Sequence, residues 1–194
     1  YKELLNFCTV DLSAFYFDIR KDVLYCDPKD SEKRKSTLIL LNIILNSLLK
    51  WFAPILSFTT EEIYQLISKK NKSIHLENFL DFPKKFENEK IERKWDELIK
   101  IRDICNISIE EKRASKEIGS SLEAELQIKL NNKFEQIVNG IDLSELCITS
   151  KAEVNFDDQI DIEVVTQKAL GNKCSVCWKI SLDPCERHPK CQII

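Results

Sequence analysis

Glycine and proline are scarce in this sequence, and methionine is absent. Among 194 residues there are 3 glycines and 5 prolines, whereas 43% of the residues are apolar and 31% are charged. This composition excludes collagen-like, low-complexity and disordered chains and is typical of amphipathic helices. Because the chain begins with Tyr1 and contains no methionine, we expect it to be a piece of a longer protein.

Common signatures of nucleotide-binding and hydrolytic enzymes are also absent. The sequence contains no Walker loop, no glycine-rich dinucleotide fingerprint and no G-x-S-x-G elbow. Carboxylates are plentiful, but they fall on the polar faces of predicted helices, where contact with solvent explains them. We therefore expect no catalytic site. The net charge of -3 gives no general attraction to nucleic acid, so any such binding must come from a local patch.

One hydrophobic run, residues 38–58, approaches the roughly 20 residues that a membrane span requires. Asn42, Asn46 and Lys50 recur in it at every fourth position and form a polar strip down one face of a helix. Pro54 then interrupts the run. We expect a buried helix of a bundle here, with no membrane span, and no signal peptide is visible.

Apolar residues at helical spacing predict four helices, over residues 4–24, 36–51, 60–68 and 87–116. The first helix should stop near Pro28, and Pro54 should end or kink the second. Thr59 and Glu62 have the spacing of a capping box at the start of the third helix. We interpret the lysines between residues 69 and 72 as a solvated helix end rather than a binding patch.

The pattern changes after Gly119, where apolar residues begin to alternate. This alternation predicts strands over residues 125–130 and 160–166, with a further strand over 146–150 and a short helix over 132–139. The predicted fold is mainly α. It consists of a helical bundle over residues 1–119, a small α+β module over 120–170 and a tail over 171–194.

The eight cysteines are distributed unevenly. Four of them stand singly in apolar stretches, where free cysteine behaves as a small hydrophobic residue: Cys8, Cys26, Cys105 and Cys147. The other four lie in the last 21 residues: Cys174, Cys177, Cys185 and Cys191. This asymmetry argues against a secreted disulfide framework and for reduced thiols, a cytoplasmic location and a metal site in the tail.

Cys174 and Cys177 form a C-x-x-C knuckle, whose spacing lets two thiolates bind one tetrahedral zinc ion. Cys185 and Cys191 can complete a four-thiolate shell, and His188 can replace either of them. Four ligands would close the shell, so we expect one structural zinc that folds the tail. A redox C-x-x-C or disulfides are the alternatives, but a redox motif requires a strand and a helix around it. His75 stands alone and is interpreted as a surface residue.

Cations surround the knuckle and its aromatic neighbour, Trp178. They are Lys173, Lys179, Arg187 and Lys190, set against the carboxylates of Asp183 and Glu186. A basic zinc unit with an exposed ring suits RNA binding, because the ring can stack on an unpaired base while the cations bind phosphates. The equally weighted alternative is that Trp178 packs over the metal site.

Four strings of the sequence, taken in chain order, point to one family. They are FCTVDLSAFYFDIRKD at 7–22, WFAPILSFTTEE at 51–62, KEIGSSLEA at 116–124 after a helix bearing Trp95 and Arg102, and KCSVCW at 173–178. Together they resemble the C-terminal part of bacterial-type isoleucyl-tRNA synthetases, which are class I aminoacyl-tRNA synthetases. The second string is shared with the valyl and leucyl enzymes, whereas the zinc tail after a small α+β module favours the isoleucyl family.

The resemblance implies an anticodon-binding bundle over 1–119 in a monomeric, ATP-dependent ligase whose catalytic and editing domains lie upstream. HIGH-like and KMSKS-like strings are absent here. The fragment should therefore bind the anticodon stem-loop of isoleucine tRNA without aminoacylating it. Trp178 matches the family's tryptophan after the second cysteine and is the candidate for stacking on an anticodon base. Arg34 and Lys35 are candidates for contacts with the RNA backbone.

Two positions depart from the family's pattern. The family's tail usually ends in a second C-x-x-C, whereas Cys191 is followed by Gln-Ile-Ile, so Cys185 or His188 must replace a ligand or the site is remodelled. Val176 stands where the family often has a basic residue, which weakens the knuckle as a phosphate site. A helical protein-interaction module with a zinc-stapled tail is the alternative function, and a redox thiol protein is a third.

Overall fold

The structure is a computed structural model that describes residues 1–68 and 72–188. It divides into two compact units. One contains residues 1–22 together with the described residues from 88 onward, and the other contains residues 23–87. Helices predominate, and a small sheet accompanies them, so the mainly α fold is confirmed. None of the helices in the described ranges has the length and hydropathy of a membrane span.

The larger unit begins with a continuous helical stretch made of three segments. These are α1 (Lys2–Asn6), a π-helical segment η1 (Phe7–Phe17) and α2 (Asp18–Cys26), whose end passes into the other unit. Its long helix is α5 (Glu89–Ala114). Asn88 caps α5, because its side-chain oxygen accepts hydrogen bonds from the amides of Lys90 and Ile91 at 3.1 and 3.2 Å.

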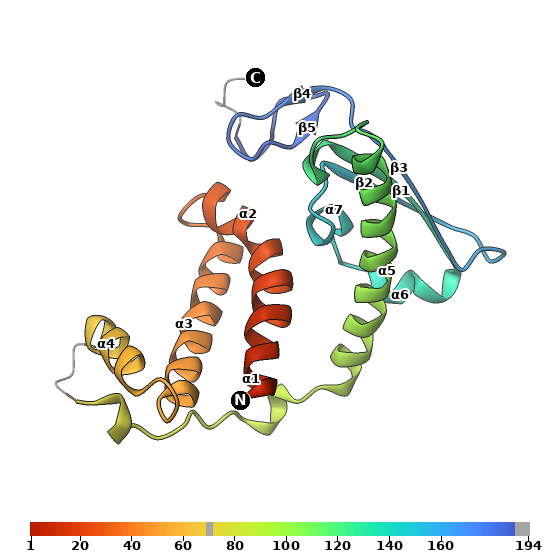
Figure 1. Cartoon of the computed structure of the whole chain (residues 1–194). Helices are drawn as coiled ribbons and strands as arrows, with labels where there is room; N and C mark the ends of the chain where they lie inside the picture. Colours follow the sequence, from red (N-terminus) through yellow and green to blue (C-terminus); the bar gives the residue numbers. More distant parts are fainter. Residues whose placement is uncertain (69–71, 189–194) are drawn as a thin grey trace. The chain divides into compact units, whose positions relative to one another are not determined.

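A three-stranded sheet follows α5 in the same unit (Figure 1). Its central strand β1 (Ala124–Leu130) runs parallel to β2 (Lys151–Phe156) and antiparallel to β3 (Ile162–Lys168). Between β1 and β2 lie η5 (Asn132–Phe134), α6 (Glu135–Val138) and α7 (Leu143–Leu146), and η4 (Ser121–Glu123) precedes β1. The tail forms a short hairpin of β4 (Asn172–Lys173) and β5 (Ile180–Ser181).

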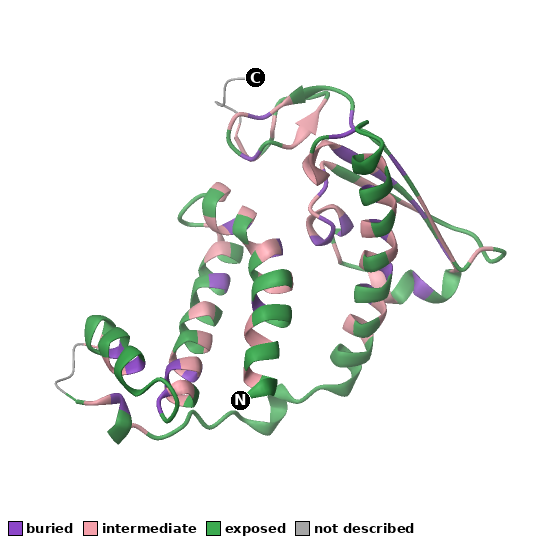
Figure 2. Cartoon of the chain, in the orientation of Figure 1, coloured by how far each residue is buried: buried purple, intermediate pink, exposed green. Residues whose placement is uncertain are grey.

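The core of this unit lies between α5 and one face of the sheet (Figure 2). Alternate residues of β1 point to that face, and Leu126, Ile128 and Leu130 are fully buried. Leu98, Ile101, Cys105 and Ile109 recur at helical spacing on α5 and belong to the same cluster. The compact unit therefore extends across the sequence-based boundary at residue 119, because α5 packs on the sheet that follows it.

The smaller unit contains α3 (Glu32–Phe52), α4 (Ser57–Ile67), η2 (Ile74–Leu76) and η3 (Lys84–Phe86). Leu49, Ala53, Tyr64 and Ile74 form its buried cluster. Glu61 of α4 anchors the start of η2, because its carboxylate accepts hydrogen bonds from the Ser73 hydroxyl and the Ile74 amide at 2.9 and 2.8 Å. The side chain of Asn46 donates to that of Asn42, and both belong to the predicted polar strip of α3.

The four predicted helices are confirmed, but the predicted capping box is wrong. Pro54 does end the second helix, and the amides of Ile55 and Leu56 then bond to the Phe52 carbonyl. This tight turn lets α4 begin at Ser57, so Thr59 lies inside its first turn rather than before it. The lysine pair at 69–70 lies outside the described residues.

Two of the three predicted strands are confirmed as β1 and β3, whereas the strand over 146–150 is wrong. Asp142 accepts hydrogen bonds from the amides of Ser144 and Glu145 and so caps the short helix α7. Ile148, with a φ of 57°, then turns the chain in the left-handed region. The strand β2 consequently starts only at Lys151.

Candidate metal centre

The tail folds back on itself in a tight knuckle between β4 and β5. The Cys174 amide donates to the Lys179 carbonyl at 2.9 Å, and the Trp178 amide donates to the Cys174 carbonyl at 3.0 Å. Gly171 precedes the knuckle with a φ of +122°, and a Cβ there would lie 2.1 Å from the Ser181 carbonyl oxygen. Only glycine therefore fits this position without moving the hairpin.

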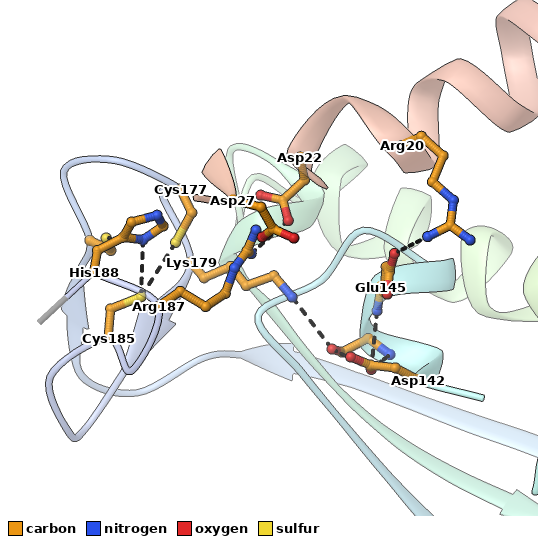
Figure 3. A network of polar contacts seen from close by, with 12 residues as sticks. Arg20, Asp22, Asp27, Asp142, Glu145, Cys177, Lys179, Cys185, Arg187 and His188 are labelled. Carbon is orange, nitrogen blue, oxygen red and sulfur yellow. Dashed lines mark hydrogen bonds and ion pairs between the residues drawn. The ribbon is translucent and has the colours of Figure 1, made fainter. Parts of the chain in front are cut away.

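The knuckle brings three cysteines and one histidine together. The ligand atoms of Cys174, Cys177, Cys185 and His188 all lie within 4.8 Å of one another, so the group can hold a metal ion. Cys177 Sγ is 3.8 Å from Cys185 Sγ, and His188 Nδ1 is 3.7 Å from Cys174 Sγ and 3.3 Å from Cys185 Sγ. Figure 3 shows the side chains of Cys177, Cys185 and His188 pointing toward one another.

Three of the separations are close to the edges of a tetrahedral zinc site. With Zn–S near 2.3 Å and Zn–N near 2.0–2.1 Å, a regular tetrahedron has S–S edges of about 3.8 Å and S–N edges of about 3.6 Å. Three of the six separations among the four ligand atoms are 3.8, 3.7 and 3.3 Å, and all six are within 4.8 Å, so small side-chain shifts would place the four atoms around one zinc ion. The donor set, three thiols and an imidazole, also suits zinc.

Burial changes the pKa of one thiol in the knuckle. Cys174 and Cys177 are buried, whereas Cys185 and His188 are half-buried. Burial, together with hydrogen bonds to Cys174 and Cys185, raises the pKa of the Cys177 thiol to about 12. This thiol is therefore protonated at neutral pH in the metal-free chain, so a metal ion that binds it must displace its proton.

The tail docks on the rest of its unit through polar contacts. The Ile180 amide donates to Ser150 Oγ at 2.6 Å, next to the start of β2. Lys179 Nζ lies 3.5 Å from Ser144 Oγ at the beginning of α7. Burial alone would raise the pKa of neighbouring Asp142, but hydrogen bonds from Ser144 and Glu145 and the Lys179 charge lower it. The carboxylate of Asp142 consequently stays charged as the cap of α7.

The structure places the residues predicted to bind RNA in two groups. Trp178 is 56% exposed, and Lys173 Nζ lies 5.4 Å from the centre of its ring. Arg187, also in the tail, forms an ion pair with Asp22 at 2.7 Å. Arg34 and Lys35 belong to the other unit, where Arg34 donates to the Asp27 carbonyl at 2.7 Å and Lys35 is exposed.

The other cysteine, lysine and histidine residues singled out by the sequence have different settings. Cys191 and Lys190 lie outside the described residues. His75 is exposed in η2 of the smaller unit. Cys105 and Cys147 are buried in the core, and hydrogen bonding between their thiols, together with burial, raises the pKa of Cys105.

A comparison with protein families gives one match, which covers residues 1–129. The family is described as the anticodon-binding domain of tRNA ligase. The match spans about two thirds of the chain, from α1 to the end of β1. This chain belongs to that family. The matched segment of this anticodon-binding domain ends before α7 and the tail, so the metal centre lies outside it.

Curated relatives extend the similarity to the rest of the chain, including the tail. The chain is 65% identical to an isoleucine–tRNA ligase of Pelagibacter ubique, over 97% of this chain and 21% of that protein. Isoleucine–tRNA ligases of Methylacidiphilum infernorum and Bartonella henselae are 40% and 37% identical, over 98% and 94% of the chain. The chain spans about a fifth of the length of these relatives. The resemblance to the isoleucyl enzymes is confirmed.

The sequence does not indicate which acidic and hydroxyl groups contact the tail. Asp22, Ser144 and Ser150 contact Arg187, Lys179 and Ile180, respectively. Asp22 lies 165 positions before Arg187 in the sequence. A single aspartate on the polar side of a predicted helix carries no signal that distinguishes it from its solvated neighbours.

Proposed function

We propose that this chain is the part of an isoleucine–tRNA ligase that binds the anticodon stem-loop of isoleucine tRNA. The observation that carries the proposal is the 65% identity to one such ligase along 97% of the chain, together with the family match over residues 1–129. The parent enzyme would attach isoleucine to its tRNA with ATP, using catalytic and editing domains elsewhere in the same chain. This part alone would bind RNA and catalyse nothing.

The proposed organisation keeps three functional parts in a monomeric, cytoplasmic enzyme. Residues 1–119 form the anticodon-binding bundle, 120–170 a junction module and 171–194 the zinc-binding tail. Packing of α5 on the sheet supports a fixed spacing between the long helix and the tail, because both belong to one compact unit. The RNA contacts of the long helix and of the tail would then keep a constant distance from each other.

One structural zinc ion would be held by Cys174, Cys177, Cys185 and His188. The short distances from His188 Nδ1 to Cys174 Sγ and Cys185 Sγ support His188 as the fourth ligand, with Cys191 as the alternative. When bound, zinc would supply folding energy and no reactive site, because four protein ligands leave no open position. The tail is too short to bury a core of its own, so its fold would depend on the metal.

The RNA-binding surface would centre on Trp178. Its exposed ring offers a face for an unpaired base, and Lys173 lies beside it to bind a phosphate. Lys179 and Arg187 extend the basic character of the tail. Lys35, exposed at the start of α3, and Arg34 would contact the RNA backbone from the other unit.

Removal of the Trp178 ring should weaken RNA binding without damaging the knuckle. Trp178 has a φ of 64°, a conformation that glycine adopts without strain, so Trp178→Gly removes the ring and leaves the backbone unstrained. Loss of one stacked base costs about 1–3 kcal/mol, or roughly 5- to 160-fold in affinity. Fluorescence anisotropy with labelled isoleucine tRNA measures the change, and metal content should stay constant. Trp178→Phe, which keeps an aromatic face, is the matched control.

Direct binding tests the proposed function. The 194-residue chain is titrated with isoleucine tRNA and with valine tRNA at several salt concentrations. We expect tighter binding of isoleucine tRNA and an affinity that falls as salt rises, because phosphate contacts release counterions. Equal, weak binding of both tRNAs would contradict the proposal and would favour the protein-interaction module.

A further inference from the structure

Helix α2 carries two ion pairs that reach far along the chain. Arg187 Nη1 lies 2.7 Å from the Asp22 carboxylate, and Arg20 Nη1 lies 2.7 Å from the Glu145 carboxylate (Figure 3). Asp22 therefore contacts the metal-binding tail, whereas Arg20 contacts α7. The two pairs have the same chemistry and length, but only Arg187 lies between residues of the ligand group.

The position of Arg187 is tied to the metal ligands on both sides. Cys185 precedes it by two residues and His188 follows it directly, and the His188 amide donates to the Cys185 carbonyl at 3.0 Å. A metal ion bound by Cys185 and His188 would hold this turn closed. Arg187 would then project from a backbone that is fixed on both sides, so pairing with Asp22 would cost side-chain freedom but little further backbone freedom.

The contact between Arg187 and Asp22 is partly shielded from water. The side chains retain 32% and 22% of their exposure, and the 2.7 Å separation is that of a charge-assisted hydrogen bond. Fully exposed ion pairs contribute little, because water and salt screen them. A shielded pair between a fixed arginine and a helical aspartate is a stronger link, and it joins the tail to the first helix.

We propose that the Arg187–Asp22 ion pair couples metal binding to the docking of the tail on α2. Arg187 is then a positioning residue that holds the knuckle, and with it Trp178, against the helical part of the same unit. Coupling between two sites is reciprocal, so a docked tail binds the metal more tightly and a bound metal docks the tail more tightly. The role in placing Trp178 rests on the proposed RNA-binding function, whereas the effect on metal affinity does not.

Metal affinity tests the coupling in the full chain. Zinc is titrated in competition with a chromophoric chelator for the parent chain, Asp22→Asn, Arg187→Gln and the double variant. We expect each single variant to bind zinc about 5-fold or more weakly, the lower end of typical coupling. The double variant should bind zinc no more weakly than Arg187→Gln alone, because that variant already breaks the contact with Asp22.

Glu145→Gln is the matched control for these titrations. It breaks the ion pair between Arg20 of α2 and Glu145 of α7, neither of which belongs to the ligand group. Its zinc affinity should equal that of the parent chain, and circular dichroism of all variants should show the same helical content. Unchanged zinc affinity in Asp22→Asn and Arg187→Gln, or an equal loss in Glu145→Gln, would overturn the proposal.

Binding of isoleucine tRNA to the same variants shows whether Arg187 positions the tail or binds phosphate itself. If Arg187 positions the tail, Asp22→Asn should weaken binding of isoleucine tRNA as Arg187→Gln does. If Arg187 binds phosphate, Asp22→Asn removes a competing carboxylate and should leave RNA binding unchanged or tighter, which would contradict the proposal. Absence of RNA binding in the parent chain would overturn the proposed function and leave the zinc result to decide the coupling.

Discussion

Serine in place of Cys174 should abolish metal binding and unfold the tail hairpin. A serine hydroxyl is a poor zinc ligand, and zinc binding supplies about 10–16 kcal/mol in small zinc-folded peptides. The hairpin of β4 and β5 has only two residues in each strand, so its own backbone hydrogen bonds stabilise it little. Amide hydrogen exchange should show loss of protection at Trp178 and Ile180, whose amides donate to the Cys174 carbonyl and to Ser150 Oγ, while β1 stays protected.

Elemental analysis of the same preparation measures the metal. We expect one zinc ion per chain before the substitution and none after Cys174→Ser. Cys8→Ser is the matched control, because Cys8 lies in the π-helical segment and is not a member of the ligand group. Zinc retained at full stoichiometry by Cys174→Ser would contradict the ligand assignment.

Truncation of Leu126 should strongly destabilise the larger unit. Its side chain is fully buried in β1, in the cluster shared with α5. Leu→Ala substitutions in cores cost about 2–5 kcal/mol, because a cavity remains where the side chain was. The free energy of unfolding, measured by urea titration, should fall by an amount in this range.

Val165→Ala provides the matched control on the same sheet. Val165 lies on β3 and is 47% exposed, so its truncation should change the free energy of unfolding by less than that of Leu126. Similar losses in the two variants would show that α5 and the sheet do not share the core described here.

Local sequence patterns predicted much of this fold. Apolar residues at helical spacing identified the long helix, α5, because its buried face is regular over many turns. Alternation identified β1 and β3 for the same reason. Errors arose where a single backbone conformation decides the outcome. The turn after Pro54 lets α4 begin at Ser57, earlier in the chain than predicted. The left-handed turn at Ile148 makes β2 begin at Lys151, later than predicted. The spacing of apolar residues shows neither effect.

The candidate site was partly predictable, because ligand chemistry is local in sequence. The C-x-x-C spacing and the nearby Cys185 and His188 identify a metal group without a structure. The partner of Arg187 was not predictable, since Asp22 is brought near it only by the tertiary fold. The left-handed backbone of Trp178 was equally invisible, because a tryptophan there breaks the usual preference for glycine.

A chimeric ligase tests most directly whether this chain recognises the anticodon of isoleucine tRNA. The matching fifth of the Pelagibacter ubique ligase, 65% identical, is replaced by this chain. Isoleucylation is then measured with isoleucine tRNA and with the same tRNA carrying a valine anticodon. We expect efficient isoleucylation of the first tRNA and a large loss of isoleucylation with the second. Equal charging of both tRNAs by the chimera, with discrimination kept by the unaltered ligase, would contradict it.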